Sequence, residues 1–226
     1  MSNLLVRRQV RRAELGLTAR EFGVLAHLST PPAIQAFLNA IPINHELTGE
    51  TVHSVRGVLR HRKAHCIEAA LLAACALWIH GDPPLVMHLD CDPCDYPHIV
   101  TLFRRGRTWG AISKSNGAYL RYRDPVYRTL RELAMSYVHE YFDKRGHKTL
   151  RSYSGAFDLR RIDPSLWVSN ENACWVAHDR LAALRHYPLV SARQARSLAP
   201  RDAFERQSAR LVEYPRPGRT RRTAGR

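Results

Sequence analysis

Long apolar runs are missing from this sequence of 226 residues. A membrane-spanning helix needs about 18 consecutive apolar residues with few charges, and no stretch of the chain supplies them. The first residues, MSNLLVRRQVRR, include several arginines but no apolar region of the kind found in secretory signals. The sequence therefore predicts a protein with no membrane partner, and we expect it in the cytoplasm.

Cysteines are few and odd in number, at positions 66, 75, 91, 94 and 174. Their spacing matches no disulfide framework of a small secreted domain, so we expect reduced thiols. The pair in CDPC (91–94) lacks a clear second pair of zinc ligands, although Cys174 and His178 form one imaginable donor pair. Calcium-binding loops of the type D-x-[DN]-x-[DN]-G are also missing. We therefore predict no metal and no other cofactor; a metal or redox role for Cys91 and Cys94 is the weaker alternative.

Acidic residues are scarce, 20 against 35 basic ones, which gives a formal net charge of +15. Such an excess is typical of nucleic-acid-binding proteins. Much of it lies in the Arg-rich segment 191–226, which contains prolines and few large apolar residues and is predicted to be a disordered tail. No recognition helix, zinc finger or aromatic-interleaved basic pattern is present. Nucleic acid bound through this tail is therefore an alternative partner, but not the favoured one.

The sequence does contain a continuous series of helix and strand patterns over residues 1–190, which we interpret as one domain. Helix-capping signals stand at Thr18, Thr30 and Ser54, and an apolar helix follows over 65–81. Gly81 is expected to end that helix in a left-handed conformation.

After Pro84 the periodicity changes from helix to strand. Three strands are predicted, over residues 84–90, 98–103 and 108–113, the last two as a hairpin. Further helices are expected from Asp124 to Phe142 and over 171–187, with an extended segment at 149–159 between them. This order predicts an α+β fold in which central N-terminal helices pack on an antiparallel sheet.

One cysteine stands where the long apolar helix begins. Cys66 follows the basic segment RHRK (60–63) and precedes the apolar run, whereas Cys75 lies inside it. Unpaired N–H groups and the macrodipole at a helix N-terminus favour a thiolate, the nucleophilic form of cysteine. The same amides can stabilise an oxyanion that develops on a substrate carbonyl. Cys66 is therefore the candidate nucleophile and Cys75 a structural thiol; the alternative is that both are simply buried helical cysteines.

A cysteine nucleophile needs a base within hydrogen-bond reach and a group that orients this base. His65 adjoins Cys66, but it points about 100° away around a helix, so we expect it to be a poor partner. His98 opens a predicted strand after a Pro-containing loop and is the favoured base. Ser113 stands roughly level with His98 on the partner strand, and Asn116 lies just beyond it. Either residue is a candidate to orient the ring.

Three segments together resemble the core of the transglutaminase-like superfamily: GVLRHRKAHCIEAALLAACALWIHGDPP (57–84), HIVTLF (98–103) and WGAIS (109–113). In that superfamily a cysteine opens a buried helix that ends in a Gly-plus-Pro turn, a histidine begins the next strand, and a Trp-containing strand bears the third member. The resemblance covers about residues 29–116. It implies a transglutaminase-like fold of papain-related architecture, with Cys66 as nucleophile and His98 as base.

The third position departs from the family pattern, because Ser113 stands where an Asp is usual. A serine hydroxyl can accept a hydrogen bond from the imidazole but carries no charge to stabilise an imidazolium. Asn116 is the other candidate, by analogy with the Asn of papain-like enzymes.

The resemblance implies thiol-dependent acyl transfer from an amide of a peptide or protein, without a cofactor. Hydrolysis by a protease, amidase or deamidase is the default among bacterial-type members, and transfer to an amine acceptor stays open. Two alternatives come from other classes. Ser113 favours a catalytically inactive binding or scaffold domain, and the positive charge favours a nucleic-acid-binding protein.

Overall fold

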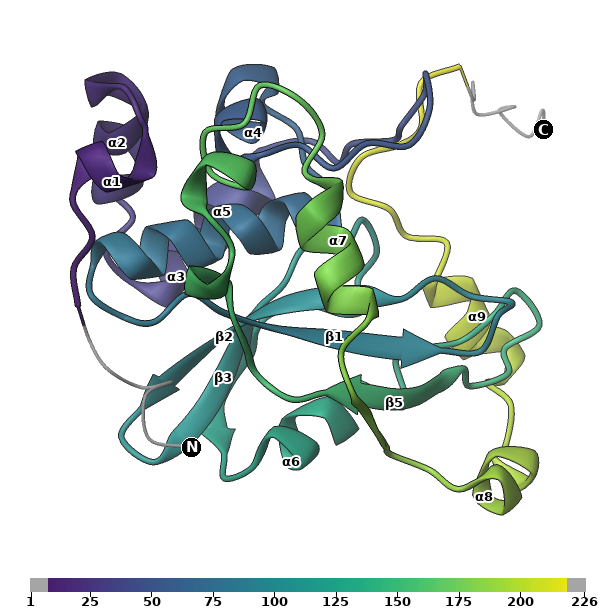
Figure 1. The fold of residues 1–226 in the computed structure, drawn as a ribbon. Helices are drawn as coiled ribbons and strands as arrows, with labels where there is room; N and C mark the ends of the chain where they lie inside the picture. The colour runs from purple at the N-terminus through teal and green to yellow at the C-terminus, as the bar shows by residue number, and fades with distance from the viewer. Residues whose placement is uncertain (1–7, 219–226) are drawn as a thin grey trace.

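In the computed structural model, which describes residues 8–218, seven strands form one sheet (Figure 1). The strands are β1 (Leu85–Cys91), β2 (His98–Arg105), β3 (Thr108–Ile112), β4 (Arg123–Tyr127), β5 (Leu150–Ser154), β6 (Phe157–Asp158) and β7 (His186–Pro188). Their order across the sheet is β4-β3-β2-β1-β5-β7, with β6 also paired to β1. All of these pairings are antiparallel. The sheet and its helices confirm the predicted α+β class.

Helices cover both faces of this sheet (Figure 1). They are α1 (Arg12–Leu15), α2 (Ala19–Ala26), α3 (Pro31–Ala40), α4 (Val55–His61), α5 (Cys66–Ile79), α6 (Leu130–Met135), α7 (Trp175–Ala182), α8 (Ala192–Ser197) and α9 (Ala203–Ser208), with 3₁₀ turns at Leu159–Arg161 and Pro164–Leu166. Helices α1 to α5 and α7 lie on one side of the sheet, and α6 lies on the other. Among residues 8–218, no helix has the length and apolar character that crossing a membrane requires.

The central strands bury side chains on both faces, as period-two alternation requires. Along β1 and β2, Val86, Ile99 and Phe103 join the core beneath the N-terminal helices. Their neighbours in sequence point the other way, and Met87 and Val100 pack with residues of α6 and the segment after it. Two buried faces explain why the strand predicted at 84–90 is a nearly continuous apolar run.

Helix α5 is buried on nearly every side. The Thr101 hydroxyl donates to the Ala70 carbonyl at 2.7 Å, and this bond fixes β2 against the first turns of α5. It places the start of β2 beside the helix N-terminus. Gly81 has a φ of +89°, the left-handed conformation predicted for it. The other predicted caps, Thr18, Thr30 and Ser54, each accept a backbone N–H at the start of a helix.

The prediction for residues 124–142 is wrong in part. Asp124 and Pro125 do not start a helix; they belong to β4, and the helix α6 begins later, after its cap at Thr129. Strand β4 lies at the edge of the sheet, where a proline can be accommodated because one side of the strand needs no hydrogen-bond donors. Pairing with β3 therefore overrides a local helix-start signal.

The prediction of a disordered tail does not hold for residues 191–218. They include α8 and α9, and Val212 forms a β-bridge with Gly117. The last described residues run beside the segment that precedes α4 (Figure 1), where the His45 ring contacts the Tyr214 carbonyl at 3.1 Å. Arginine contributes to this packing, because the guanidinium of Arg201 lies 4.3 Å and 4.2 Å from two aromatic ring centroids. The rest of the predicted tail, 219–226, lies outside the described residues.

Candidate functional site

Cys66 is the first residue of α5, as the sequence predicts. The chain reaches this position through Arg62, which ends α4 with a φ of +54°. Backbone hydrogen bonds from Ala64 to Pro42 and from Asn44 to Ala64 then hold the approach to the helix. Cys66 is partly exposed, whereas Cys75, nine residues further on, is completely buried. The N-terminal thiol is therefore the accessible one of the two.

His98 and Ser113 form a direct contact. The Nε2 atom of His98 lies 2.8 Å from Oγ of Ser113, and both side chains are buried. The Ser113 hydroxyl also lies 2.6 Å from the Leu120 carbonyl, to which it donates. A hydroxyl has a single proton, so it accepts from Nε2–H of His98. That contact leaves Nδ1 as the nitrogen of His98 available to the thiol.

Ser113 is itself held firmly. Its backbone N–H donates to Oε1 of Gln35 at 3.0 Å, and its carbonyl accepts from Nε2 of the same side chain at 2.8 Å. Gln35 lies on α3, so this pair joins the end of β3 to the helical layer. The sequence gives no sign of this link, because the two residues stand 78 positions apart.

Substitution of Ser113 by Ala should lower the free energy of unfolding by about 1–3 kcal/mol without unfolding the protein. The change removes two hydroxyl bonds, to His98 and to the Leu120 carbonyl, each worth about 0.5–1.5 kcal/mol, but leaves the two bonds to Gln35. Urea denaturation measures the loss, and an unchanged free energy of unfolding would show that the hydroxyl does not hold the His98 ring.

Asn116, the other predicted orienting residue, has different partners. Its side-chain amide donates to the Tyr214 carbonyl at 2.9 Å and accepts from the Tyr214 N–H at 2.9 Å. The structure therefore places Asn116 at the C-terminal segment, and Ser113 is the residue that contacts His98. Lys114, between them, is buried, and its amine donates to the carbonyls of Leu38 and Ile41. Burial lowers the pKa of Lys114 to about 8.

The expectation that His65 is a poor partner of Cys66 is wrong. His65 is the N-cap of α5 and has extended backbone angles, so the helical spacing of about 100° per residue does not apply to it. Its side chain makes a hydrogen bond with Cys66. Its other contacts are with the Thr51 carbonyl, at 2.8 Å from Nε2, and with Glu68, at 3.4 Å.

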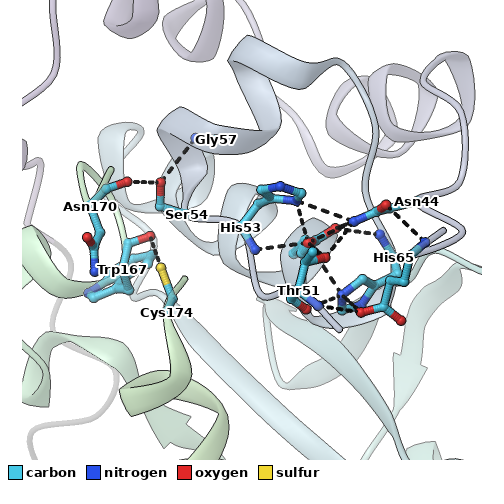
Figure 2. A network of polar contacts seen from close by, with 11 residues as sticks. Asn44, Thr51, His53, Ser54, Gly57, His65, Trp167, Asn170 and Cys174 are labelled. Carbon is cyan, nitrogen blue, oxygen red and sulfur yellow. Dashed lines mark hydrogen bonds and ion pairs between the residues drawn. The ribbon is translucent and has the colours of Figure 1, made fainter. Parts of the chain in front are cut away.

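The side chain of Glu68 is fully buried, and it is the centre of a polar network to which Asn44, Thr51, His53 and His65 belong, the residues labelled together in Figure 2. Asn44 donates to both of its carboxylate oxygens at 3.1 Å, and the Thr51 hydroxyl donates at 2.9 Å. The N–H groups of His53 and His65 donate at 2.9 Å each, and the His53 ring lies 2.6 Å away. The spacing of His65 and Glu68 is that of a capping box, a signal the sequence does contain.

Among Cys66, Cys75, Cys91 and Cys174, Cys66 has the acidic thiol. Burial raises its pKa, but hydrogen bonds and charge from His65 and His98 more than offset this, and the pKa is about 5. Burial alone raises the pKa of Cys75 well above its usual range. The pKa values of Cys91 and Cys174 are raised to about 12, chiefly by burial. At neutral pH, Cys66 is therefore a thiolate and these three residues are thiols.

A cavity of about 470 Å³ opens onto this thiolate. Its wall includes Cys66, His98 and His65. The rest combines aromatic and apolar residues with three charged ones and a polar segment: Ile43, Tyr96, Pro97, Tyr119, Leu120, Tyr141 and Phe142, then Asp95, Lys114 and Glu140, and 115–117. The reactive sulfur thus faces a space that can hold a small molecule or a few residues of a peptide.

The residues considered for metal binding are not gathered into a site. Within residues 8–218 no three His, Cys, Asp or Glu side chains are grouped as a metal would require. Cys174 is buried and contacts the Trp167 carbonyl, and His178 lies beside Asp179 at 3.0 Å. Cys94 is exposed. Cys174 and His178, the imagined second ligand pair, therefore do not join Cys91 and Cys94 in a group that could hold a metal.

Comparison of the sequence with known proteins gives no family for this chain. No model of a known protein family matches the chain, and no curated protein matches it.

Proposed function

We propose that this protein is a transglutaminase-like thiol enzyme that transfers acyl groups from amides of peptides or proteins. The observation that carries the proposal is the meeting of Cys66 and His98 at one cavity, with Ser113 in contact with the His98 ring and the pKa of Cys66 lowered to about 5. A thiolate at a helix N-terminus beside an oriented imidazole is the arrangement that nucleophilic cysteine catalysis needs. The resemblance of the Cys, His and Trp segments to the superfamily supports the same reading.

In the proposed acylation step the Cys66 thiolate attacks the carbonyl carbon of the amide. Backbone N–H groups of the first turn of α5 are available for the developing oxyanion. His98, protonated at the nitrogen that faces the sulfur, then gives its proton to the leaving amine as the C–N bond breaks. Cys66 is left as a thioester and His98 as a neutral base.

In the second step water or an amine attacks the thioester. His98 takes the proton of the attacking group, the C–S bond breaks, and the thiolate is restored. Ser113 holds the ring during both transfers but supplies no charge to the imidazolium, in contrast to the carboxylate usual in the superfamily. We therefore expect a slower enzyme than its carboxylate-bearing relatives, with no cofactor.

Acylation by p-nitrophenyl acetate, followed by intact-mass and peptide mapping, tests the proposal. The expected result is one acetyl group on Cys66, released by water or faster by an added amine. Cys66→Ser should give no thioester, and Cys75→Ala, a matched change in the same helix, should behave as wild type. A wild-type chain that forms no acyl-enzyme with this ester or with peptide thioesters would overturn the proposal and favour the inactive binding domain.

A further inference from the structure

Two imidazoles contact the sulfur of Cys66, and only one of them belongs to the proposed proton relay. His65 and His98 both make side-chain hydrogen bonds with Cys66. Both also line the cavity, so neither is hidden behind the other. They differ in what lies on the far side of each ring: His98 meets the neutral Ser113, and His65 meets the carboxylate of Glu68.

The groups that surround Nε2 of His65 favour a positively charged ring. Its Nε2 atom lies 2.8 Å from the Thr51 carbonyl and within 3.4–3.6 Å of the carboxylates of Glu68 and Glu46. All three groups are acceptors, so this nitrogen carries a proton. The ring also makes a hydrogen bond with Cys66, and a ring that donates both to these acceptors and to a thiolate is an imidazolium.

We propose that His65, held by the buried carboxylate of Glu68, is a second catalytic histidine whose permanent positive charge keeps Cys66 as a thiolate while His98 moves protons. This inference rests on the proposed function. It assigns to His65 and Glu68 the charged pair that Ser113, which is neutral, does not form with His98. In the superfamily a carboxylate orients the histidine base, but here the buried carboxylate, Glu68, lies beside His65 and not beside His98. Glu68 acts through His65 and is a positioning residue.

The charges of the site balance under this assignment. In the state ready for acylation, the thiolate and the Glu68 carboxylate carry two negative charges, and His65 and His98 carry two positive ones. When His98 gives its proton to the leaving amine, the thioester has replaced the thiolate, and the pair of His65 and Glu68 is unchanged. Breakdown of the thioester then restores the sulfur anion beside a cation that is already in place.

Other titratable groups face this pair and must be considered in a test. From the segment before α4, Glu46 and His53 face His65 and Glu68. From β2 and the segment after α6, His98 and Tyr141 interact with Cys66. The pKa of Tyr141 is raised well above its usual range by burial and by the negative charge of Cys66, so this phenol is neutral throughout the working range. Among residues 8–218, the cationic groups that act on the sulfur are His65 and His98, and Lys114 lies elsewhere in the cavity wall with its amine donating to the carbonyls of Leu38 and Ile41.

The rate of Cys66 alkylation by iodoacetamide as a function of pH separates the two histidines. We expect His65→Gln to move the midpoint upward by at least about one pH unit, because an adjacent opposite charge shifts a pKa by about 1–3 units. His98→Gln should move it less, because the neutral Ser113 and not a carboxylate lies behind that ring, and should still lower amide turnover strongly. The exposed His27→Gln is the matched control and should leave the profile unchanged.

Glu68→Gln gives an independent readout, since it keeps the shape of the side chain and removes the charge behind His65. It should move the midpoint upward in the same direction as His65→Gln. Where this variant fails to fold, His65→Gln decides alone, and ultraviolet titration of the thiolate gives the same midpoint without a reagent. A larger shift in His98→Gln than in His65→Gln would overturn the inference.

The alkylation profile does not depend on any acyl donor. A wild-type chain that forms no acyl-enzyme but loses its acidic thiolate in His65→Gln would refute the proposed function and leave the role of His65 in thiolate formation intact. A chain that forms the acyl-enzyme but keeps its thiolate in His65→Gln would refute only the role of His65.

Discussion

Replacement of Glu68 by Leu should lower the free energy of unfolding by about 3–5 kcal/mol, the usual cost of removing one partner from a buried ionic network. The carboxylate is fully buried and accepts from Asn44, Thr51 and the His53 backbone. Leucine has a similar volume but no acceptor, so these donors would be left buried without partners. Urea denaturation followed by circular dichroism measures the loss.

A carboxylate at the surface provides the control. Glu50 lies in the same segment as the network and is exposed, and Glu50→Gln should change the free energy of unfolding by less than about 0.5 kcal/mol. A Glu68→Leu protein as stable as wild type would show that the network contributes little to the fold.

The same network predicts how stability depends on pH. Burial raises the pKa of Glu68, but the charge of His65 and backbone hydrogen bonds lower it below its ordinary value of 4.5. Its contribution is therefore present above about pH 4.5 and is lost as the pH falls through the folded pKa. Burial lowers the pKa of His65, but its bonds to Cys66 and the charge of Glu68 raise it to about 9. Its contribution is complete below about pH 6.5 and is lost as the pH rises through about 9.

Cys66 contributes with the opposite sign to His65: its pKa is lowered from 9.0 to about 5, so its contribution is complete above about pH 9 and is lost as the pH falls through about 5. From about pH 6.5 to about 9 the gain from Cys66 offsets the loss from His65, and we expect a plateau of stability there in the wild-type chain. In Glu68→Leu the acid limb should be flatter because the titrating carboxylate is gone, and the contribution of His65 should be smaller because the charge that raises its pKa is gone. Denaturation series over the pH range from acid to alkaline would show this directly.

Replacement of His98 by Ala should lower kcat/KM for amide substrates about 10²–10⁴-fold, the range typical of general acid–base catalysis. The loss follows from the leaving amine, which must receive a proton as the C–N bond breaks. Release of p-nitrophenolate needs no such proton, so acylation by p-nitrophenyl acetate should fall much less. Parallel kinetics with a peptide amide and with the ester measure the difference.

The exposed His27→Gln variant should match wild type with both substrates and controls for the loss of a histidine elsewhere. Equal losses on the ester and the amide would argue against proton donation by His98 and would instead indicate a role confined to the thiolate.

Local sequence signals predict most of the helix ends and central strands of this fold. Caps at Thr18, Thr30 and Ser54 and the terminating Gly81 are properties of a few neighbouring residues, and the structure confirms each of them. The strands predicted near 84–90, 98–103 and 108–113 also exist, because alternation and a Gly turn are local as well. The prediction at Asp124 and Pro125 is wrong because the edge of the sheet, formed by distant residues, decided the conformation there.

For the candidate site, too, local sequence signals identify some residues and distant contacts decide others. Sequence reasoning located Cys66 through its place at a helix start and His98 and Ser113 through a hairpin register, and the structure brings these three together. Whether they catalyse acyl transfer stays a prediction. Asn116 is a candidate because it lies just beyond Ser113 and by analogy with the Asn of papain-like enzymes, but its amide binds the C-terminal segment, nearly a hundred residues away.

The sequence by itself determined where α2, α3, α4 and α5 begin, which thiol stands at an N-terminus and which histidine opens a strand. Only the tertiary structure decided that His65 turns toward Cys66 and that Glu68 is buried behind it. An N-cap residue is free of the helical spacing, so its side-chain direction depends on what packs around it. The charge state of a buried carboxylate depends in turn on donors gathered from Asn44, Thr51 and His53, which reach it only when the chain has folded.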